Sequence, residues 1–449
     1  MKRIVVVGSG LAGICAALEA RAQGAEVLML EMQTEERRGG NTAVSGGAFL
    51  APSADTEAAR QAFVESLDAS TLGRGNRVLF RAIADRVLGD LQWLSQRGAD
   101  FLPAYACAPP HRCSVHPLEP GQFVGTPRLM RSLYEALDAQ GVQVHYGARV
   151  TDLMLSSTGA VSGVKATRGG AEVAFEADAV VLATGGYSGN KETLMKFVGP
   201  EAAGLSLRGV DWLMGEGIEM AQRVGAQVGN MEGIESLHVA AVDPSNPKGG
   251  NPSRAIPYSI AINADGERYV DESRGYVANG KAALKQPGQT VAIVFDAQIR
   301  SMPGVQTAMT TYRNMGLTVL EAPDLATLAA AIQVPPERLE ETVAAFNASI
   351  EDGKAMAAQP AKTAWATPLQ VPPFHALYPC RPAITLTFGG LVIDEKARVL
   401  AGSGQAIPGL YAVGEMAGCL FHHDYLGGGS LSNCLSMGRV AGRDAAGLR

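Results

Sequence analysis

The chain has 449 residues, 53 of them glycine, and a formal net charge of −6. It is too long for one small core and predicts two domains, and its acidic balance excludes nucleic acid or an anionic membrane surface as an expected partner. No uninterrupted apolar run reaches the roughly 18 residues of a membrane span, so we expect a cytoplasmic protein with no membrane span.

A dinucleotide-binding turn is predicted at the start of the chain. The apolar strand 3–7 runs directly into GSGLAG, which is followed by an Ala-rich helix and a second strand that ends at Glu31. Gly8 permits the tight turn, Gly10 lets the backbone approach a pyrophosphate, and Gly13 lets the helix lie close to the strand. The helix N-terminus then presents free N–H groups to phosphate oxygens, and Glu31 is placed for a ribose hydroxyl.

The next elements alternate between helices and strands. A Gly- and Ser-rich loop precedes a helical stretch from about residue 56 to residue 96. Thr126 followed by proline predicts an N-cap and a first helical turn, and Gly141 ends that helix. Short alternating strands between 142 and 175 lead into the apolar segment 179–186, which predicts a buried strand that ends in a turn.

The composition of the chain changes near Ile234. From there to about residue 370, prolines and polar residues punctuate shorter elements, with one amphipathic helix from Pro336 to about Ile350. The glycine-rich character returns at Leu386 and continues to a final helix from about Ser430. We therefore predict a first domain that is completed by the end of the chain and interrupted by a cap. The predicted boundaries are 1–233 and 386–449 for the two parts of the first domain and 234–385 for the cap.

The six cysteines are scattered and contain no C-x-x-C or C-x-x-C-H pattern; they are Cys15, Cys107, Cys113, Cys380, Cys419 and Cys434. This distribution predicts a reduced protein without bound haem, zinc or iron–sulfur cluster.

Six motifs, taken together, resemble the FAD-dependent fumarate reductase and succinate dehydrogenase flavoprotein family over nearly the whole chain. The motifs are GSGLAG with Glu31, GGNTAVSGG, VVLATGGY, GERYVDE, TFGGLVID and IPGLYAVGE. The resemblance implies an α/β protein with a Rossmann-type FAD-binding domain, similar to that of glutathione reductase, and an inserted α+β cap domain.

By this resemblance FAD fills the first turn and the later glycine loops. Glu31 would hold the adenosine ribose, the loop 39–47 would wrap the pyrophosphate and the flavin edge, residues 183–185 would pass near the adenosine, and Glu415 would bind the ribityl chain. The positive end of the helix near Ser430 would stabilise negative charge at the N1 and C2 carbonyl side of a reduced flavin. The expected FAD residues are Gly8, Gly10, Leu11, Ala12, Gly13, Glu31, Met32, Gly39, Gly40, Asn41, Thr42, Ser45, Gly46, Gly47, Arg149, Val150, Ala183, Thr184, Gly185, Gly414, Glu415, Ser430 and Leu431.

The attachment of the flavin is expected to be non-covalent. Some members of the family attach FAD through a histidine in the loop that corresponds to 39–47, and Asn41 stands at that place here.

The chain departs from the members that interconvert succinate and fumarate. Leu386 and Tyr425 stand where those members have a histidine and an arginine that bind the dicarboxylate. Those members also use an arginine as the acid, and Arg274 lies about two residues before the position that corresponds to it. At least two of the dicarboxylate anchors are therefore missing.

The replacements resemble the branch of the family that desaturates ketones beside the carbonyl, typified by 3-ketosteroid Δ1-dehydrogenases. Tyr425 with Gly429, and Tyr276 four residues after Glu272, match the spacings of that branch. A third tyrosine, which assists the base in that branch, has no partner here because Val115 occupies its place.

The residue types suit desaturation beside a carbonyl. That reaction needs a base for the α-proton, a donor to the developing enolate oxygen and an acceptor for the β-hydride, which flavin N5 provides. The Tyr425 hydroxyl and the Gly429 N–H are expected to form an oxyanion hole. Tyr276 is expected to be the base; because an unperturbed tyrosine has a pKa near 10, a cation such as Arg274, or a relay through a buried group, would have to assist it.

Several substrate residues and alternatives remain open at this stage. The expected substrate-binding residues are His238, Arg254, Arg381, Leu386 and Phe388. Arg112 is a further candidate for a carboxylate, and the segment 422–424, His-His-Asp, reads as a polar pocket rim rather than a metal site.

We expect a cap smaller than in the ketosteroid enzymes and therefore a small ketone or oxo-acid as the substrate, in particular a cyclic one. This chain also resembles the branch of tricarballylate dehydrogenases, at ITLTFGGL and at the turn 286–288. A polycarboxylate therefore remains an alternative substrate. A flavin-binding redox protein without turnover is the third alternative. Oxygen, a quinone or a carrier protein remains open as the electron acceptor.

Overall fold

The computed structural model describes residues 1–107, 110–119, 125–241, 255–314, 317–422 and 424–447, without the side chains of 235–241, 311 and 314. Contacts divide the chain into two units. The first consists of Met1–Thr193, Gly209–Ile234 and Leu386–Arg449, and the second consists of Leu194–Arg208 and Glu235–Thr385. The segment 194–208, which we expected in the first domain, falls in the second unit because Ser206 and Leu207 pair with Ala383 and Ile384 there.

A six-stranded sheet forms the centre of the first unit, with the strand order β19-β20-β10-β1-β2-β6. Its strands are β1 (Arg3–Val7), β2 (Glu26–Glu31), β6 (Gln143–Tyr146), β10 (Ala179–Leu182), β19 (Arg398–Leu400) and β20 (Ala406–Ala412). All pairs are parallel except that between β19 and β20. The Val-rich strand β1 lies inside this sheet, buried from Ile4 to Val7, as expected for a parallel strand covered on both faces. The predicted α/β class is confirmed.

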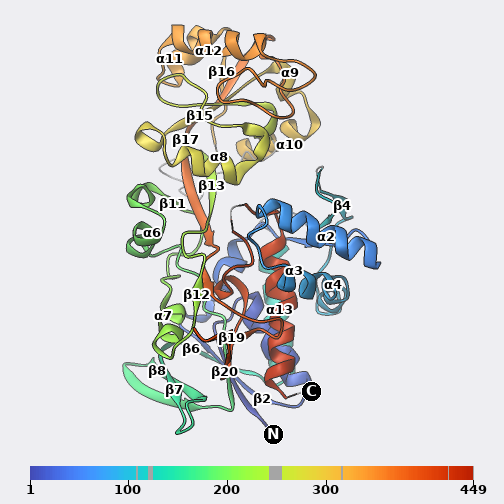
Figure 1. Ribbon diagram of the computed structural model, residues 1–449, viewed down its shortest axis with the longest axis vertical. Helices are drawn as coiled ribbons and strands as arrows, with labels where there is room; N and C mark the ends of the chain where they lie inside the picture. The colour runs from blue at the N-terminus through green and yellow to red at the C-terminus, as the bar shows by residue number, and fades with distance from the viewer. Residues whose placement is uncertain (108–109, 120–124, 242–254, 315–316, 423, 448–449) are drawn as a thin grey trace. The chain divides into compact units, whose positions relative to one another are not determined.

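Two helices that are far apart in the sequence pack closely in this unit. They are α1 (Leu11–Ala22) and α13 (Gly429–Ala445), the latter drawn in red in Figure 1. A Cβ on Gly438 would lie 2.5 Å from the Ala12 carbonyl oxygen, and one on Gly442 would lie 2.2 Å from the Ala16 carbonyl oxygen. The glycines four residues apart therefore let the two backbones approach each other.

The helical stretch predicted from 56 to 96 consists of three helices, α2 (Glu57–Ser70), α3 (Arg77–Ala84) and α4 (Val87–Ser95). Thr56 and Asn76 cap the first two by accepting backbone N–H bonds through their side chains. The chain breaks between them where Leu72 and Gly73 take positive φ angles of 55° and 73°. The helix predicted at Thr126 is α5 (Gly125–Ala139). Because α5 begins at Gly125, Thr126 lies in its first turn and is not its N-cap, and its hydroxyl donates to the Ser45 carbonyl at 3.2 Å.

Smaller elements complete the first unit. One three-stranded sheet contains β3 (Ala48–Ala51), β5 (Ser114–Pro117) and β4 (Tyr105–Ala106), in that order. A second contains β7 (Ala148–Leu155), β8 (Val161–Arg168) and β9 (Ala171–Glu176). The remaining elements are α7 (Glu216–Arg223) and the pair β12 (Val228–Gly229) and β18 (Gly390–Leu391), while α6 (Lys191–Phe197) spans the boundary between the units.

The second unit is built around a sheet in which β17 is the longest strand. Its strands are β11 (Ser206–Leu207), β13 (Ile234–Ala241), β14 (Ile260–Ile262), β15 (Val291–Asp296), β16 (Leu320–Ala322) and β17 (Phe374–Thr387). Its helices are α8 (Tyr276–Ala283), α9 (Ala297–Arg300), α10 (Pro303–Asn314), α11 (Leu325–Ala331) and α12 (Pro336–Ala348). Every residue of β15 is buried, and this strand lies in an apolar core that includes Phe295 and Phe346.

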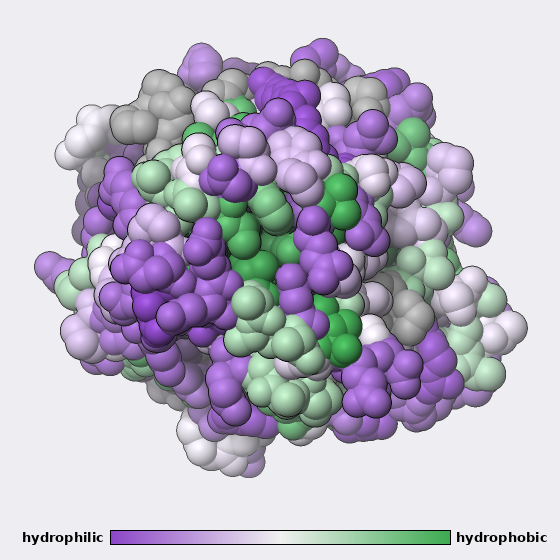
Figure 2. Space-filling model, turned by 90° about the horizontal axis from the view of Figure 1, so that it is seen from above, coloured by the Kyte–Doolittle hydropathy of each residue, from purple (hydrophilic) through white to green (hydrophobic). Residues whose placement is uncertain are grey.

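The surface drawn in Figure 2 is mainly hydrophilic around a central hydrophobic area. The large hydrophobic side chains that are exposed in the second unit include Met356 (60%), Trp365 (37%) and Val371 (43%). Within the described parts of the chain, no helix combines the length and the apolar character needed to cross a membrane.

Candidate functional site

The first glycine turn has a geometry that admits no side chain at two positions. Gly8 takes a φ of 102°, and a Cβ there would lie 2.4 Å from the Ala183 carbonyl oxygen. A Cβ on Gly13 would lie 2.1 Å from the Gly8 carbonyl oxygen. The strand β1, the turn and the helix α1 are thus packed without space for a side chain. This leaves backbone N–H groups at the start of α1 as the surface that a phosphate would meet.

Glu31, at the end of β2, is buried and tied to the same turn. Its Oε2 accepts hydrogen bonds from the Ser9 N–H (3.0 Å) and the Ser9 hydroxyl (2.7 Å), and its Oε1 accepts one from the Gln33 N–H (2.8 Å). Tyr134, which sequence reasoning missed, donates its hydroxyl to the Ser9 carbonyl at 2.7 Å. An ionised carboxylate has room for about four hydrogen bonds, so Glu31 retains capacity for ribose hydroxyls.

The loop 39–47 lies beside this turn. Its Thr42 Oγ1 accepts a hydrogen bond from the Leu11 N–H at 3.3 Å. Before the loop, the Arg38 guanidinium lies 3.7 Å above the Tyr134 ring. The Ser45 hydroxyl oxygen is buried and has no hydrogen-bond partner among the described residues. Because such a group is costly to bury alone, it marks a place for a ligand or a solvent molecule.

Glu415 lies where three segments of the first unit meet. Its Oε2 accepts a hydrogen bond from the Asn41 side-chain amide at 3.0 Å. Its Oε1 accepts from the Thr387 N–H at 2.9 Å and from the Thr387 hydroxyl at 3.2 Å. A Cβ on Gly186 would lie 2.3 Å from the same oxygen. Burial raises the pKa of Glu415 to about 7, and the hydrogen bonds from Thr387 and Asn41 oppose that shift.

The predicted Gly429 is the first residue of α13, and the predicted Tyr425 lies in the segment just before that helix. Gly428, with a φ of 94°, lies so close to β3 that a Cβ would be 3.0 Å from the Ala48 carbonyl oxygen. The Tyr425 hydroxyl oxygen accepts hydrogen bonds from the N–H groups of Gly428 (3.2 Å) and Ser430 (3.3 Å). The Gly429 N–H instead donates to the Leu426 carbonyl at 3.0 Å.

This arrangement changes the expected oxyanion hole. The Gly429 N–H closes a turn in this structure, so we correct the expectation that it points at a ligand beside Tyr425. The amides on either side of Gly429 polarise the Tyr425 hydroxyl, which makes that O–H a stronger hydrogen-bond donor.

Three aromatic rings surround this turn. Phe421 meets Tyr425 edge to face with 5.0 Å between ring centroids, and Phe388 lies 5.8 Å from Phe421 and 6.1 Å from Tyr425. A Cβ on Gly429 would lie 3.0 Å from the Phe421 ring. Phe388 and Phe421 are both buried, at 3% and 6% exposure. Leu386, the other predicted substrate residue here, is partly exposed.

His422 belongs to a charged group next to the aromatic cluster. Its Nε2 lies 3.7 Å from a Glu232 carboxylate oxygen, which lies 3.8 Å from the Arg74 guanidinium. His423 lies outside the described residues. The described residues contain no group of three or more His, Cys, Asp or Glu side chains arranged to hold a metal ion.

The remaining predicted catalytic residues belong to the second unit. Tyr276 is the first residue of α8 and packs, partly buried, against the core of that unit. Arg274 is exposed just before it. Arg381 is exposed on β17, and His238 lies on β13, with its side chain outside the described part. Arg254 lies outside the described residues. The joint action of these residues with Tyr425 stays a prediction.

The motif GERYVDE builds a buried ion cluster that sequence reasoning missed. Glu272 and Arg268 form a pair at 2.7 Å with side chains only 0% and 2% exposed. Lys362, also fully buried, lies 3.7 Å from Glu272 and donates to the Ser259 carbonyl at 2.7 Å. Burial lowers the pKa of Lys362 to about 8, although Glu272 opposes the shift. The cluster anchors the segment that leads to Arg274 and Tyr276.

Two further expected residues have protein partners. Arg149 lies on β7 and forms an ion pair with Glu216, while Val150 beside it is buried. Arg112 forms an ion pair with Glu65. Val115, at the place of the missing third tyrosine, is buried on β5 opposite Tyr105. No sequence signal predicted the partners Glu216 and Glu65, because they are distant along the chain.

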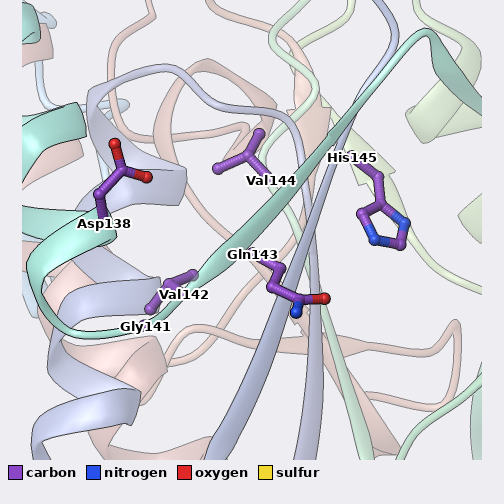
Figure 3. A pocket seen from close by; sticks show the side chains of 6 residues that line it. All are labelled: Asp138, Gly141, Val142, Gln143, Val144 and His145. Atoms are coloured by element: carbon purple, nitrogen blue, oxygen red, sulfur yellow. The ribbon is translucent and has the colours of Figure 1, made fainter.

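A separate hollow of about 460 Å³ lies where α5 leads into β6. Figure 3 shows its lining, with Asp138 and His145 at opposite ends. The hollow starts at the amino end of β6, whereas nucleotides bind outside the carboxyl ends of parallel strands. Its polar groups do not converge, so we do not assign the cofactor to it.

The first unit meets the requirements of a bound dinucleotide. The first unit contains the tightly packed glycines Gly8 and Gly13 and the carboxylates of Glu31 and Glu415. It also contains the Ser45 hydroxyl, which has no hydrogen-bond partner among the described residues. Glu31 is the last residue of β2, which is the place of a ribose-binding acid in this fold.

Comparisons with known proteins agree with this geometry. The family model described as FAD binding domain matches residues 3–431. The chain is 28% identical to a fumarate reductase (cytochrome) of Shewanella frigidimarina over 456 residues, 99% of this chain and 76% of that protein. It is 28% identical to a urocanate reductase of Eggerthella lenta over 466 residues, 99% of this chain and 74% of that protein.

A solved structure shares the fold over nearly the full length of both chains, so it does not bear out the expectation of a cap smaller than in the ketosteroid enzymes. It is the 3-ketosteroid-Δ4-(5α)-dehydrogenase of Rhodococcus jostii in complex with 4-androstene-3,17-dione, with a TM-score of 0.79 and 26% identity, covering 100% of this chain and 97% of that one. These comparisons confirm the predicted cofactor, FAD.

Proposed function

Because this chain belongs to the FAD binding domain family and is an FAD-dependent oxidoreductase acting on CH–CH groups, we propose that it introduces a double bond α,β to the carbonyl of a small ketone or oxo-acid. The observation that carries this proposal is the Tyr425 hydroxyl, which accepts hydrogen bonds from the N–H groups of Gly428 and Ser430. A phenol polarised in this way is suited to donate a hydrogen bond to a carbonyl oxygen that gains charge as an enolate forms.

The aromatic cluster supports a cyclic substrate. Phe421 and Tyr425 form an edge-to-face pair, and the Phe388 ring centroid lies 5.8 Å from that of Phe421 and 6.1 Å from that of Tyr425. Aromatic and apolar walls with a few fixed polar groups are typical of sites for small organic ligands. A ring whose carbonyl oxygen meets the Tyr425 hydroxyl would find apolar contacts around that hydrogen bond.

In this proposal Tyr276 takes the α-proton of the substrate, and Tyr425 donates to the carbonyl oxygen. FAD, when bound, supplies an acceptor for the β-hydride. Tyr276 must lose its own proton before it can act as the base. The positive charge of Arg274, two residues before Tyr276, would favour the phenolate form of Tyr276. The buried pair of Arg268 and Glu272 holds this segment in place.

We propose further that FAD is held without a covalent bond. Asn41 stands at the position of the attachment histidine, and both ends of its amide are engaged: Nδ2 donates to Glu415, and Oδ1 accepts from the Val210 N–H at 3.0 Å. An amide is also a poor nucleophile compared with an imidazole. Acid precipitation of the purified protein should therefore leave the flavin in the supernatant, and flavin retained in the washed pellet would contradict the proposal.

The proposed reaction is tested by anaerobic titration of the purified flavoprotein. A small cyclic ketone should bleach the visible absorption of the oxidised flavin and yield the conjugated enone, identified by its ultraviolet absorption and mass. Ketosteroids and tricarballylate serve as comparison substrates. Restoring colour with oxygen, a quinone analogue or an oxidised carrier protein then identifies the electron acceptor. If tricarballylate bleaches the flavin and no ketone does, the proposed substrate class is wrong.

A second candidate is the reverse chemistry on an unsaturated acid, because the relatives above are named as reductases of fumarate and urocanate. This candidate requires a cation for the substrate carboxylate, and Arg274 and Arg381 are exposed in the second unit. The chemically reduced protein would then be reoxidised by fumarate, urocanate or a tricarboxylate with a double bond. Substituting Arg381 by Gln would raise KM for that acid without changing turnover of a neutral enone.

A further inference from the structure

Two of the six cysteines face each other in the hairpin formed by β4 and β5. The register of these strands pairs Tyr105 with Val115 and Ala106 with Ser114, and the next step in that register pairs Cys107 with Cys113. The Cys107 N–H donates to the Cys113 carbonyl at 2.9 Å, which continues the ladder. Both cysteines are free thiols in this structure.

The distance between such positions suits a disulfide. Cys107 and Cys113 form a hydrogen-bonded pair, and such residues have Cα atoms about 5.5 Å apart. Disulfides join Cα atoms about 4.4–6.8 Å apart. The two side chains also project from the same face of the hairpin. The bond would therefore form with little movement of the backbone.

The two thiols differ in environment. Cys113 is 2% exposed, whereas Cys107 is partly exposed. The hydrogen bond from the Cys113 thiol lowers the pKa of Cys107, while that same hydrogen bond, together with burial, raises the pKa of Cys113. A partly exposed thiol of lowered pKa next to a buried second thiol is the arrangement of an attacking and a resolving cysteine.

We propose that Cys107 and Cys113 form a thiol–disulfide exchange site that reacts with small-molecule disulfides. The Cys107 thiolate attacks one sulfur of the disulfide, which breaks its S–S bond, releases one thiolate and leaves a mixed disulfide on Cys107. The Cys113 thiol then loses its proton, and its sulfur attacks the Cys107 sulfur and expels the second thiol. In total, two protein thiols lose two electrons and two protons, and the small disulfide is reduced to two thiols.

The site has a structural connection to the flavin-binding residues of the first unit. The strand β5 pairs with β3 as well as with β4. The Leu50 N–H and carbonyl of β3 are both hydrogen-bonded to the Ser432 hydroxyl, in the first turns of α13, at 2.9 and 2.8 Å. The proposal does not depend on the substrate of the enzyme.

The test is treatment of the intact flavoprotein with glutathione disulfide at neutral pH, followed by alkylation, digestion and mass spectrometry. The wild-type protein should lose two hydrogens in a disulfide that joins Cys107 to Cys113. Cys113→Ser should instead hold one glutathionyl group on Cys107, because the resolving sulfur is gone. A wild-type protein that keeps the glutathionyl group on Cys107, or in which Cys107 does not react, would overturn the proposal.

Matched controls separate this chemistry from general thiol exposure. Cys419 is also partly exposed, but burial raises its pKa, so Cys107 should react at least about tenfold faster than Cys419. Cys113→Ala removes the hydrogen-bond donor that Cys113→Ser retains, so Cys107 should be alkylated more slowly in the Ala variant. The bound flavin spectrum of each variant reports whether it is folded, and equal alkylation rates of Cys107 in two folded variants would contradict the proposed activation.

Discussion

At the scale of single residues, Tyr425 and Glu415 are two candidate site residues of the first unit whose side chains accept hydrogen bonds. Each is held by hydrogen bonds from segments that are distant in the sequence or from the start of α13. Tyr425 offers a polarised hydroxyl, and Glu415 offers a carboxyl group that burial keeps partly protonated at neutral pH. The two residues can therefore be tested by different measurements.

Tyr425→Phe should lower kcat for the ketone substrate by about 100- to 1,000-fold, the usual loss for one oxyanion donor. The ring stays, so the aromatic contacts with Phe421 and Phe388 are retained. The measurement is stopped-flow reduction of the flavin under anaerobic conditions. Tyr378→Phe is the control, because the Tyr378 hydroxyl donates to the Gln333 side chain, at 3.3 Å, in an exposed hydrogen bond of the second unit. A variant at Tyr425 with unchanged kcat would exclude the proposed role.

Glu415 should make the stability of the apoprotein depend on pH. Its pKa rises from an ordinary 4.5 to about 7 on folding, so between these values the folded state holds a proton that the unfolded chain has released. The contribution of Glu415 to the free energy of unfolding is therefore most favourable below about pH 4.5, and it declines as the pH rises to about 7. Between these two pH values the contribution falls by roughly 3 kcal/mol.

The measurement is chemical denaturation of wild type and Glu415→Gln at several pH values. The glutamine side chain of the variant cannot titrate. The free energy of unfolding of the variant, measured relative to that of the wild type, should therefore increase as the pH rises from about 4.5 to 8. The loss of the Asn41 and Thr387 hydrogen bonds adds an offset that does not change this slope. Glu395→Gln, which removes an exposed carboxylate, is the control. Parallel curves for wild type and Glu415→Gln would show that the carboxyl group is not perturbed.

At the scale of elements, glycines set how closely α1 can approach its neighbours. Gly13 faces the Gly8 carbonyl, while Gly438 and Gly442 of α13 face α1 backbone carbonyls. Interiors pack too densely to absorb a new methyl group at such distances. The start of α1 is therefore held between the first turn and α13.

Gly13→Ala should destabilise the protein by about 1–3 kcal/mol through overpacking and should weaken FAD binding. Gly89→Ala is the matched control, because Gly89 is exposed in α4 and an added Cβ there meets no atom within 4 Å. That control should stabilise the protein by about 0.5–1 kcal/mol, since alanine has the higher helix propensity. Thermal unfolding and FAD titration measure both effects. Similar responses to the two substitutions would contradict the steric argument.

At the scale of the whole molecule, the chain forms two units, and all the residues assigned to the FAD cradle lie in the first. Binding of FAD to the folded state should raise its stability by about 2.7 kcal/mol when free FAD is 100 times Kd. Hydrogen exchange of the apoprotein and holoprotein should show slower exchange at residues 8–13, 39–47 and 428–432. The amides of β15, in the core of the second unit, serve as the internal control and should change little.

The sequence alone determined the fold class, the FAD cofactor and the main elements. A strand, a glycine turn, a helix and a second strand follow one another within the first 31 residues, and their periodicity and glycine spacing are local properties of the chain. Several predicted residues, such as Gly8, Gly13 and Glu31, accordingly meet at one turn.

Only the tertiary structure decided which groups meet across long distances in the chain. It joined Asn41 to Glu415 and brought Lys362 to the buried pair of Arg268 and Glu272. Hydrogen bonding, burial and the resulting pKa shifts depend on neighbours in space. No local pattern of residues specifies those neighbours, because they come from segments that only folding brings together.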